Sequence, residues 1–388
     1  MHASNTPLLR HVGDPMTESA NKPIRLLGAH MPAAGGIVGC LTGGKAIGCT
    51  AVQIFTSSPR QWQHKPIDPE VAETFKRTQR ELEIPFTIAH DSYLINLAAP
   101  NREILEKSRE AFRAELERAE TLDIPWVVTH MGASMESAEE DALGLLCESM
   151  SKILQETEGM KVGIALETTA GQGTSLGYRF EHIARMVEGC LGHTRVGVCL
   201  DTCHVFVAGY DIRTEETFNQ TFDSFGSLIG FDRLKAIHAN DTKKPLGSKV
   251  DRHDHIGDGE LGMETFRRLV NDRRLAHVPI LIETPEAETM HAVNLARLQK
   301  LAAGESPGIR IKVRFFGHFS DFWPNETIVE IPPGATVSDM VAAILQMEPK
   351  LKGFEAICRA AVNEEYVPFN QLLNSGDTAA FIPPMSGG

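Results

Sequence analysis

Short apolar segments alternate with longer amphipathic stretches through the first three hundred or so residues of the chain. Eight segments are rich in Val, Ile and Leu, and helical stretches separate them. This alternation is typical of βα units, and eight units in about 280 residues predict a TIM-type (β/α)8 barrel. The predicted strands are residues 25–30, 51–56, 86–90, 126–130, 163–167, 196–201, 234–238 and 279–283.

The helical pattern is clear in the stretch from Arg102 to Leu122. Charged residues fill most of it, and apolar residues recur at spacings of three and four, at Ile104, Leu105, Phe112, Leu116 and Ala119. We therefore expect a helix that packs an apolar face on the barrel and carries its charges elsewhere.

A domain boundary follows Ala302, where helical periodicity stops and Gly and Pro cluster over residues 303–308. Beyond it, residues 310–317 and 326–331 have strand patterns, and Thr336 with Asp339 has the form of a capping box that opens a helix. Two more strands are expected before the C-terminus, which predicts a small α+β domain. The expected organisation is a mobile extension (1–23), a barrel (24–303), a linker (304–308) and a second domain (309–388).

Composition is that of a packed protein without a membrane span. The chain has 388 residues, 42% hydrophobic and 23% charged, and no apolar run nears the roughly 20 residues that cross a bilayer. Seven scattered cysteines without a C-x-x-C pair indicate a reducing cytoplasm. We also expect the protein to be a monomer. A net charge of −13 argues against bulk electrostatic coating of nucleic acid, although bound divalent cations would offset the carboxylates that hold them.

Potential metal ligands close six of the eight predicted strands. In a TIM barrel the carboxyl ends of the strands meet on one face, where the active site is built. Any one of these residues could instead be a turn residue or a helix cap. Six in register predict a shared cup, formed by His90, His130, Glu167, Asp201, His238 and Glu283.

Three more candidates follow: His204 stands three residues past a strand end, and Asp251 and His253 lie on a loop. The nine His and carboxylate side chains suit zinc or manganese in open catalytic sites better than a structural zinc, which favours Cys. With about three ligands per open zinc and a shared carboxylate, nine ligands indicate two or three ions, an arrangement suited to phosphodiester hydrolysis. A sugar isomerase or epimerase would need one or two ions and a base, and would leave Asp251 and His253 without a role.

Longer motifs resemble the endonuclease IV family of apurinic/apyrimidinic endonucleases, over about residues 25–303. The matching stretches are Gly28-Ala29-His30 with Ala34-Gly35-Gly36, His90-Asp91-Ser92-Tyr93-Leu94-Ile95-Asn96-Leu97, Thr169-Ala170-Gly171-Gln172-Gly173, Val198-Cys199-Leu200-Asp201-Thr202-Cys203-His204 and Gly247-Ser248-Lys249-Val250-Asp251-Arg252-His253. The resemblance implies a zinc-dependent enzyme of base excision repair. Such an enzyme cuts the phosphodiester 5′ to an abasic site in double-stranded DNA and leaves a 3′-hydroxyl.

The resemblance also implies three zinc ions per chain, with manganese an alternative at one site. The first zinc would use His90, His130 and Glu167, the second would share Glu167 and add Asp201, His238 and Glu283, and the third would use His204, Asp251 and His253. Glu167, as the bridging carboxylate, and Glu283 would serve catalysis.

The damaged nucleotide would be turned out of the duplex into the metal cup, a step that costs least where a base is missing. By resemblance, Arg60, Tyr93 and Leu94 would penetrate the helix at the lesion. Taken without the family, Arg60 is a solvated loop charge and Tyr93 a packing residue.

The last 80 or so residues resemble the ubiquitin-like sulfur carriers, particularly the small subunit of molybdopterin synthase. The matching stretches are Arg310-Ile311-Lys312-Val313-Arg314-Phe315-Phe316-Gly317, Gly376-Asp377 and the tail Phe381-Ile382-Pro383-Pro384-Met385-Ser386-Gly387-Gly388. The resemblance implies a β-grasp fold. Its terminal Gly387 and Gly388 would be adenylated by an E1-like enzyme and converted to a thiocarboxylate, with the large subunit of molybdopterin synthase as a further partner. The alternative is a frayed end without function.

Several other cysteines and histidines are expected to have no role in the functional site. Cys199 and Cys203 are expected in the core, while His182, His277 and His291 are expected at the surface without carboxylate partners. Two alternative functions stay open: a metal-dependent sugar isomerase or epimerase, and a carrier or protein modifier whose barrel is only a binding platform. The last helix of a barrel ends opposite the active site, so we expect the second domain to start far from the metals and not to plug the site.

Overall fold

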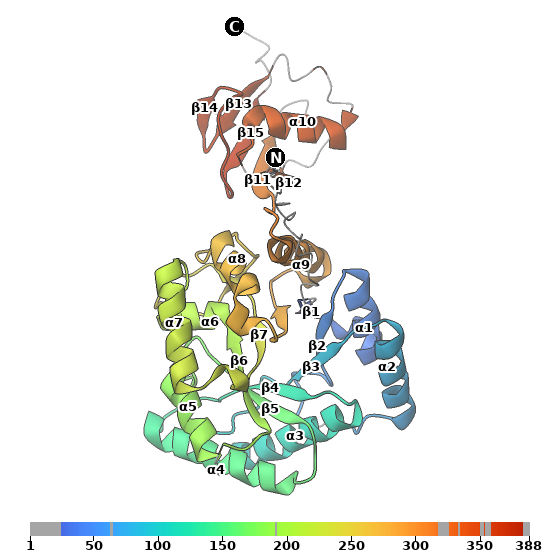
Figure 1. Ribbon diagram of the computed structural model, residues 1–388, viewed down its shortest axis with the longest axis vertical. Helices are drawn as coiled ribbons and strands as arrows, with labels where there is room; N and C mark the ends of the chain where they lie inside the picture. The colour runs from blue at the N-terminus through green and yellow to red at the C-terminus, as the bar shows by residue number, and fades with distance from the viewer. Residues whose placement is uncertain are drawn as a thin grey trace, which may run out of the picture.

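A computed structural model describes residues 25–62, 65–190, 192–316, 326–332, 334–349, 353 and 358–382. Eight parallel strands close a barrel in the order β1-β10-β7-β6-β5-β4-β3-β2 (Figure 1). The predicted TIM barrel is confirmed, and Glu283 lies one residue beyond its strand. The strands are β1 (Leu27–His30), β2 (Ala51–Phe55), β3 (Phe86–His90), β4 (Trp126–His130), β5 (Gly163–Glu167), β6 (Val196–Asp201), β7 (Leu234–His238) and β10 (Ile280–Ile282).

Helices surround the barrel. They are α1 (Gly36–Ala46), α2 (Pro69–Glu81), α3 (Arg102–Thr121), α4 (Glu139–Glu156), α5 (Phe180–Gly189), α6 (Thr202–Ala208), α7 (Glu215–Leu228), α8 (Met263–Asn271) and α9 (Ala287–Ala303). Among the described residues, the connections hold the short 3-10 turns η1 (Ala33–Gly35), η2 (Phe231–Arg233) and η3 (Arg273–Leu275), and a hairpin of β8 (Asp241–Thr242) and β9 (His253–Asp254). The segments expected at 1–23 and at the terminal Gly387 and Gly388 lie outside the described residues.

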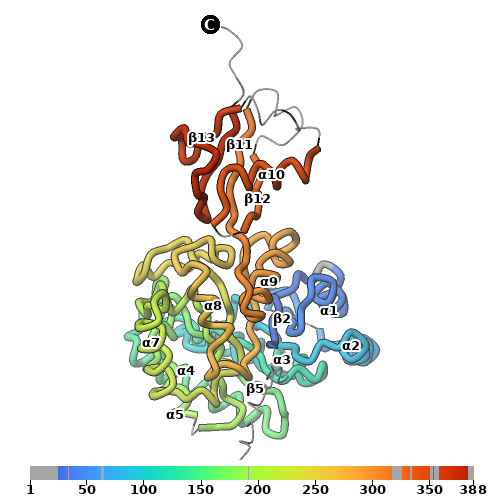
Figure 2. Tube along the Cα trace, turned by 45° about the horizontal axis from the view of Figure 1, so that its top comes forward, coloured from blue at the N-terminus to red at the C-terminus, as the bar shows by residue number. Residues whose placement is uncertain are grey.

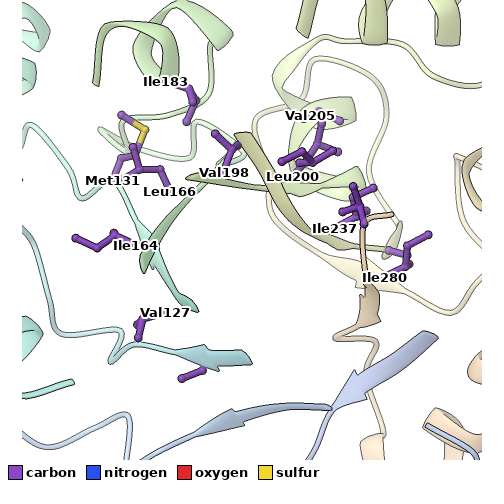
Figure 3. Packing of buried hydrophobic residues seen from close by; sticks show 14 of the residues in the cluster. Val127, Met131, Ile164, Leu166, Ile183, Val198, Leu200, Val205, Ile237 and Ile280 are labelled. Carbon is purple, nitrogen blue, oxygen red and sulfur yellow. The ribbon is translucent and has the colours of Figure 1, made fainter. Parts of the chain in front are cut away.

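The strands alternate between two apolar environments. Outward side chains join the helices in one large core, part of which Figure 3 shows around Ile164, Leu166 and Val198, with Ile183 of α5. Inward side chains form a smaller cluster of Ala51, Ile88, Val128, Ala165, Cys199, Ala236 and Leu281. This inner layer closes the barrel and is the floor on which the functional side chains stand.

Helix α3 corrects one expectation. Its apolar face packs as predicted, but Ile104 is exposed, while Arg109, Glu115 and Arg118 are buried. Arg118 pairs with Glu115 and donates to Thr56 Oγ1 at 2.9 Å, just beyond the end of β2. Glu115 and Arg118 are buried because they pair with each other and with the adjacent loop, whereas Arg109 contacts Ser149 of α4. Helical periodicity reveals neither contact.

The C-terminal part is a five-stranded sheet, in the order β12-β11-β15-β13-β14, with one helix packed on it. Its elements are β11 (Ile309–Phe315), β12 (Glu326–Ile331), α10 (Val337–Met347), β13 (Arg359–Val362), β14 (Glu365–Val367) and β15 (Thr378–Ile382). Three strands follow the helix where two were predicted, because the short β14 pairs with β13 in a hairpin. The predicted capping box of Thr336 and Asp339 is present.

The sheet domain lies beyond α8 and α9, at one side of the barrel (Figures 1 and 2). Asp258, in the loop before α8, contacts the buried Arg297 of α9 at 3.1 Å and also pairs with Arg310 of β11. This carboxylate therefore links the two parts of the chain. Among the described residues, no helix is long and apolar enough to cross a membrane.

Candidate metal centre

The functional side chains form a ring to which each of the eight barrel strands, or the residue just after it, contributes one member. Side chains of a strand alternate, so the residue two positions after an inward apolar residue also faces inward. Every member of the inner floor is followed in this way by a polar residue, and His30 completes the ring on β1. The ring is His30, Gln53, His90, His130, Glu167, Asp201, His238 and Glu283.

Glu167 is the centre of this ring. Its side chain is fully buried, and its Oε2 lies 3.1 Å from both His90 Nε2 and His130 Nε2. Its Oε1 lies 2.9 Å from His238 Nδ1, which is also 3.3 Å from Glu283 Oε2. One carboxylate thus joins the residues predicted for the first and second ions.

The residues predicted for the third ion come together beside the ring. His204 Nε2 lies 3.1 Å from Asp251 Oδ2, and His253 Nε2 lies 3.3 Å from Asp251 Oδ1 and 3.7 Å from Asp201 Oδ2. Asp201 caps α6 by accepting the His204 N–H at 2.8 Å, so the helix-cap alternative and the ligand-like position hold together for this residue. The β8–β9 hairpin places His253.

Hydrogen bonds turn the imidazoles toward the carboxylates. His90, His204 and His253 each place Nδ1 on a backbone oxygen, those of Asp91, Thr168 and Glu283, at 3.0, 2.8 and 3.2 Å. Their Nε2 atoms therefore face the site, as in metal centres whose ligating histidines donate their other N–H outward.

The spacing of the donor atoms fits metal ions. In a tetrahedral zinc site with bonds of about 2.0–2.1 Å, neighbouring donor atoms are about 3.3 Å apart. Most of the nitrogen-to-oxygen distances above lie close to this value. Among the described residues, the groups compatible with an ion are His90-His130-Glu167, Glu167-Asp201-His238-Glu283, Asp201-His204-His253 and Cys203-Asp251-His253. His253 Nε2 is buried without a hydrogen-bond partner, which also favours an ion beside it.

The electrostatics of the buried cluster are strongly coupled. Burial alone would lower the pKa of His90, but the hydrogen bond and charge of Glu167 outweigh it and raise the pKa to about 9. Burial would raise the pKa of Glu167, whereas the charges of His238 and His130 hold it well below its usual value. The carboxylate of Glu167 is thus held ionised, which is the state that binds cations.

Comparisons with known proteins identify the family. A family model described as a xylose isomerase-like TIM barrel matches residues 44–301. A Chloroflexus aurantiacus protein named "Probable endonuclease 4" is 50% identical over 279 residues, which cover 71% of this chain and 98% of that protein. A Geobacter sulfurreducens protein of the same name is 45% identical over 278 residues, with coverage of 71% and 94%. The chain belongs to the endonuclease IV family.

A solved structure agrees with this membership. The crystal structure of endonuclease IV from Thermus thermophilus is 32% identical, with a TM-score of 0.64, and the match covers 72% of this chain and 99% of that one. A D-tagatose 3-epimerase-like protein is 19% identical with a TM-score of 0.51, which shows the shared barrel fold. A ThiS family model matches residues 313–388, so the predicted resemblance is confirmed for both parts of the chain.

Two pockets flank the ring of this endonuclease IV homologue. The larger, about 440 Å³, is lined by residues that include Leu94, His130, His204 and Asp251. The other, about 290 Å³, is lined by residues that include His30, His253 and Glu283. Tyr93 lines both pockets and is 64% exposed. A substrate group can therefore approach the cluster past an exposed aromatic ring.

The residues predicted to contact DNA lie on neighbouring segments. Arg60 is exposed on the segment after β2, and Tyr93 and Leu94 follow β3. Ser92 Oγ donates to Pro59 O at 2.8 Å, which joins the two segments.

His30 and Gln53 are ring members that were not predicted as site residues. His30 Nδ1 lies 3.0 Å from Glu283 Oε1, and Gln53 contacts both His238 and Glu283. A pattern in the sequence could have revealed them: like the other ring members, each stands two positions after an inward-facing residue of its strand. A polar residue inside the apolar segment of β2 is a second signal.

Two histidines expected at the surface are buried. His182 accepts from the Gly177 N–H at 3.2 Å and lies 3.2 Å from Glu139, so the expected lack of a carboxylate partner was also wrong. His291 is 2% exposed and donates to Thr284 O. Both helices turn these side chains inward onto loops that offer polar partners. His277 is exposed, and Cys199 and Cys203 are buried, as expected.

Proposed function

We propose that the barrel is a metal-dependent endonuclease that hydrolyses the phosphodiester 5′ to an abasic site in double-stranded DNA and leaves a 3′-hydroxyl. The observation that carries this proposal is the gathering of nine ligand-type side chains in overlapping groups, with Glu167 facing four imidazoles, in a chain that belongs to the endonuclease IV family. A one-ion sugar isomerase would not require the group of His204, Asp251 and His253.

We propose zinc as the metal, three ions per chain, held by the residue sets predicted from the sequence. The donor set of five histidines and four carboxylates supports zinc, with manganese an alternative at one site. Such ions would activate water and neutralise charge on the phosphate. The chain's own contribution is to hold the ions close together, with Glu167 and Glu283 as the catalytic carboxylates.

The face around the cup is suited to a nucleic acid. The proposed helix-penetrating residues are Arg60, Tyr93 and Leu94, and an exposed aromatic ring can stack on a base. Exposed Lys249 and Arg252 lie on the β8–β9 connection, and Arg252 lines the larger pocket. These cations support contacts with phosphates next to the lesion in spite of the net charge of −13.

The proposal is tested on a labelled duplex with a single abasic analogue. The expected product is a strand cut on the 5′ side of the lesion, whose new end a DNA polymerase extends because it carries a 3′-hydroxyl. The same duplex without the lesion should stay intact. A purified, metal-loaded chain that leaves the abasic duplex uncut, or cuts both duplexes equally, would contradict the proposal.

Tyr93→Ala is expected to weaken the use of abasic DNA by about tenfold or more in kcat/KM, since stacking on a base contributes about 1–3 kcal/mol. Metal content should not change. Tyr366→Ala is the matched control, because Tyr366 is also 64% exposed but lies on β14 of the second domain. Equal kinetics for the two variants would argue against a DNA contact by Tyr93.

For the second domain we propose a sulfur-carrier role, with activation of the carboxylate of Gly388 by an E1-like adenylating enzyme. The match of the ThiS family to residues 313–388 supports it, and the large subunit of molybdopterin synthase is a proposed partner. The tail itself lies outside the described residues. Mass spectrometry after incubation with an activating enzyme, ATP and a sulfur donor should detect an adenylate or thiocarboxylate on Gly388; no mass change would oppose the role.

Deletion of residues 304–388 is expected to change cleavage by less than about tenfold. We propose residues 24–303 as the complete catalytic unit, 304–308 as a linker and 309–388 as the carrier domain. Helix α9 has 17 residues, so its end lies about 25 Å along its axis from its start near Glu283. Kinetics of the truncated and full chains, and of full-length Arg310→Ala, measure this independence; a larger loss on truncation would show that the barrel depends on the second domain.

A further inference from the structure

Gln53 is the ring member that cannot carry a charge. It lies on β2, is fully buried, and pairs in register with His30 of β1 and Ile88 of β3. An unpaired buried amide costs about 1–3 kcal/mol, so a glutamine in this otherwise apolar strand requires partners. Both ends of its amide find them within the ring.

The amide joins two residues of the same proposed ion site. Gln53 Oε1 lies 2.7 Å from His238 Nε2, and Gln53 Nε2 lies 2.5 Å from Glu283 Oε1. The ionised carboxylate of Glu283 only accepts hydrogen bonds, so the amide nitrogen must face it. The amide oxygen then faces His238 and accepts the proton carried by its Nε2.

This hydrogen bond fixes the tautomer of His238. Nδ1 lies 2.9 Å from Glu167 Oε1 and 3.3 Å from Glu283 Oε2, so when a cation is bound and the proton stays on Nε2, the lone pair of Nδ1 would face that cation together with the two oxygens. A cation between His238 Nδ1, Glu167 Oε1 and Glu283 Oε2 would offset the repulsion among these three electron-rich atoms. In His90, His204 and His253 a backbone oxygen takes the second nitrogen, whereas in His238 the acceptor is a side chain.

We propose that Gln53 is a positioning residue of the metal centre, which holds His238 in the tautomer that binds through Nδ1 and orients Glu283 toward the same ion. His30 lies beside both groups, since its Nδ1 is 3.0 Å from Glu283 Oε1 and 2.9 Å from Gln53 Nε2. The inference rests on the proposed metal-dependent function and adds to it a residue outside the nine ligands.

Two substitutions separate the two hydrogen bonds. Gln53→Met removes the hydrogen bonds to His238 and Glu283 at similar side-chain volume. It should lower the affinity for one ion by about 10- to 100-fold and kcat by a similar factor, the usual effect of removing a group that orients a metal ligand. Gln53→Glu still accepts from His238 but loses the donor to Glu283 and sets two carboxylates side by side, a repulsion that a bound cation offsets. It should therefore bind that ion more tightly than Gln53→Met. KM for abasic duplex should change little in both, because Gln53 is buried below the DNA-facing surface.

The readouts are zinc affinity by chelator competition, zinc content after dialysis, and kcat and KM on abasic duplex. Thr87→Val is the matched control, since Thr87 is buried on the adjacent β3 and its hydroxyl has no hydrogen-bond partner; it should retain wild-type affinity. Wild-type affinity in Gln53→Met, or equal affinities in the Met and Glu variants, would overturn the proposal. A wild-type chain that binds zinc without cutting abasic DNA would contradict only the endonuclease function, and one that binds no metal would refute both.

Discussion

Glu167→Gln is expected to lower the cleavage of abasic duplex by more than about 100-fold, beyond the usual 10- to 100-fold effect of changing a group outside the ligand shell. Glutamine keeps the size of the side chain but removes the charge. The two carboxylate oxygens of Glu167 face three imidazoles, those of His90 and His130 at 3.1 Å and that of His238 at 2.9 Å. No other ring member faces both ion groups in this way, so the loss should affect two ions together.

Circular dichroism should show that Glu167→Gln folds, because the apolar floor of the barrel and its helices remain. Glu115→Gln is the matched control: Glu115 is also a buried glutamate, but its partners are Arg118 and Thr56 on the outer side of the barrel. It should lower thermal stability, since it leaves a buried arginine without its counter-charge. Zinc content should stay normal in this control. Near-normal nicking by Glu167→Gln would contradict the bridging role.

Prolonged chelation is expected to abolish cleavage, and added zinc should restore it. The nine predicted ligands fall into overlapping groups, and the donor atoms within each group lie within 4.8 Å of one another, so elemental analysis of the loaded chain should give two to three ions. Removal should be slow, because Glu167, Asp201 and His238 are fully buried. A chain that holds a single ion, or that keeps full activity after its metal is removed, would refute the multinuclear centre.

Metal loading should also stabilise the fold. Four carboxylates and five imidazoles are held close together, and a cation that binds the folded state alone adds to the free energy of unfolding. Thermal unfolding with and without zinc measures this effect. The melting temperature should rise with zinc in the wild type and much less in Glu167→Gln.

Local pattern made much of this protein predictable. The strand that ends at His130 and the one that ends at Glu167 were located from short apolar runs, residues 126–128 and 163–166, because a parallel strand buried on both faces needs largely apolar sequence. The capping box of Thr336 was also predictable, because it depends on residues three positions apart.

Contacts between distant segments were not predictable. Helical spacing placed the charges of α3 in solvent, yet Glu115 and Arg118 are buried because Thr56, about sixty positions earlier, lies opposite them. His182 is buried for the same kind of reason, since the loop that precedes its helix and the distant Glu139 provide its partners.

The sequence alone determined the eight strands, the ligand-type residues at the ends of six of them and the family, since each depends on the order of neighbouring residues. Only the tertiary structure decided how these residues meet: which oxygen of Glu167 faces which imidazole, and that Gln53 and His30 complete the ring. The physical reason is closure of the barrel. Joining β1 to β10 places His30 beside Glu283, which lies more than 250 residues later in the chain. No pattern of neighbouring residues predicts that contact.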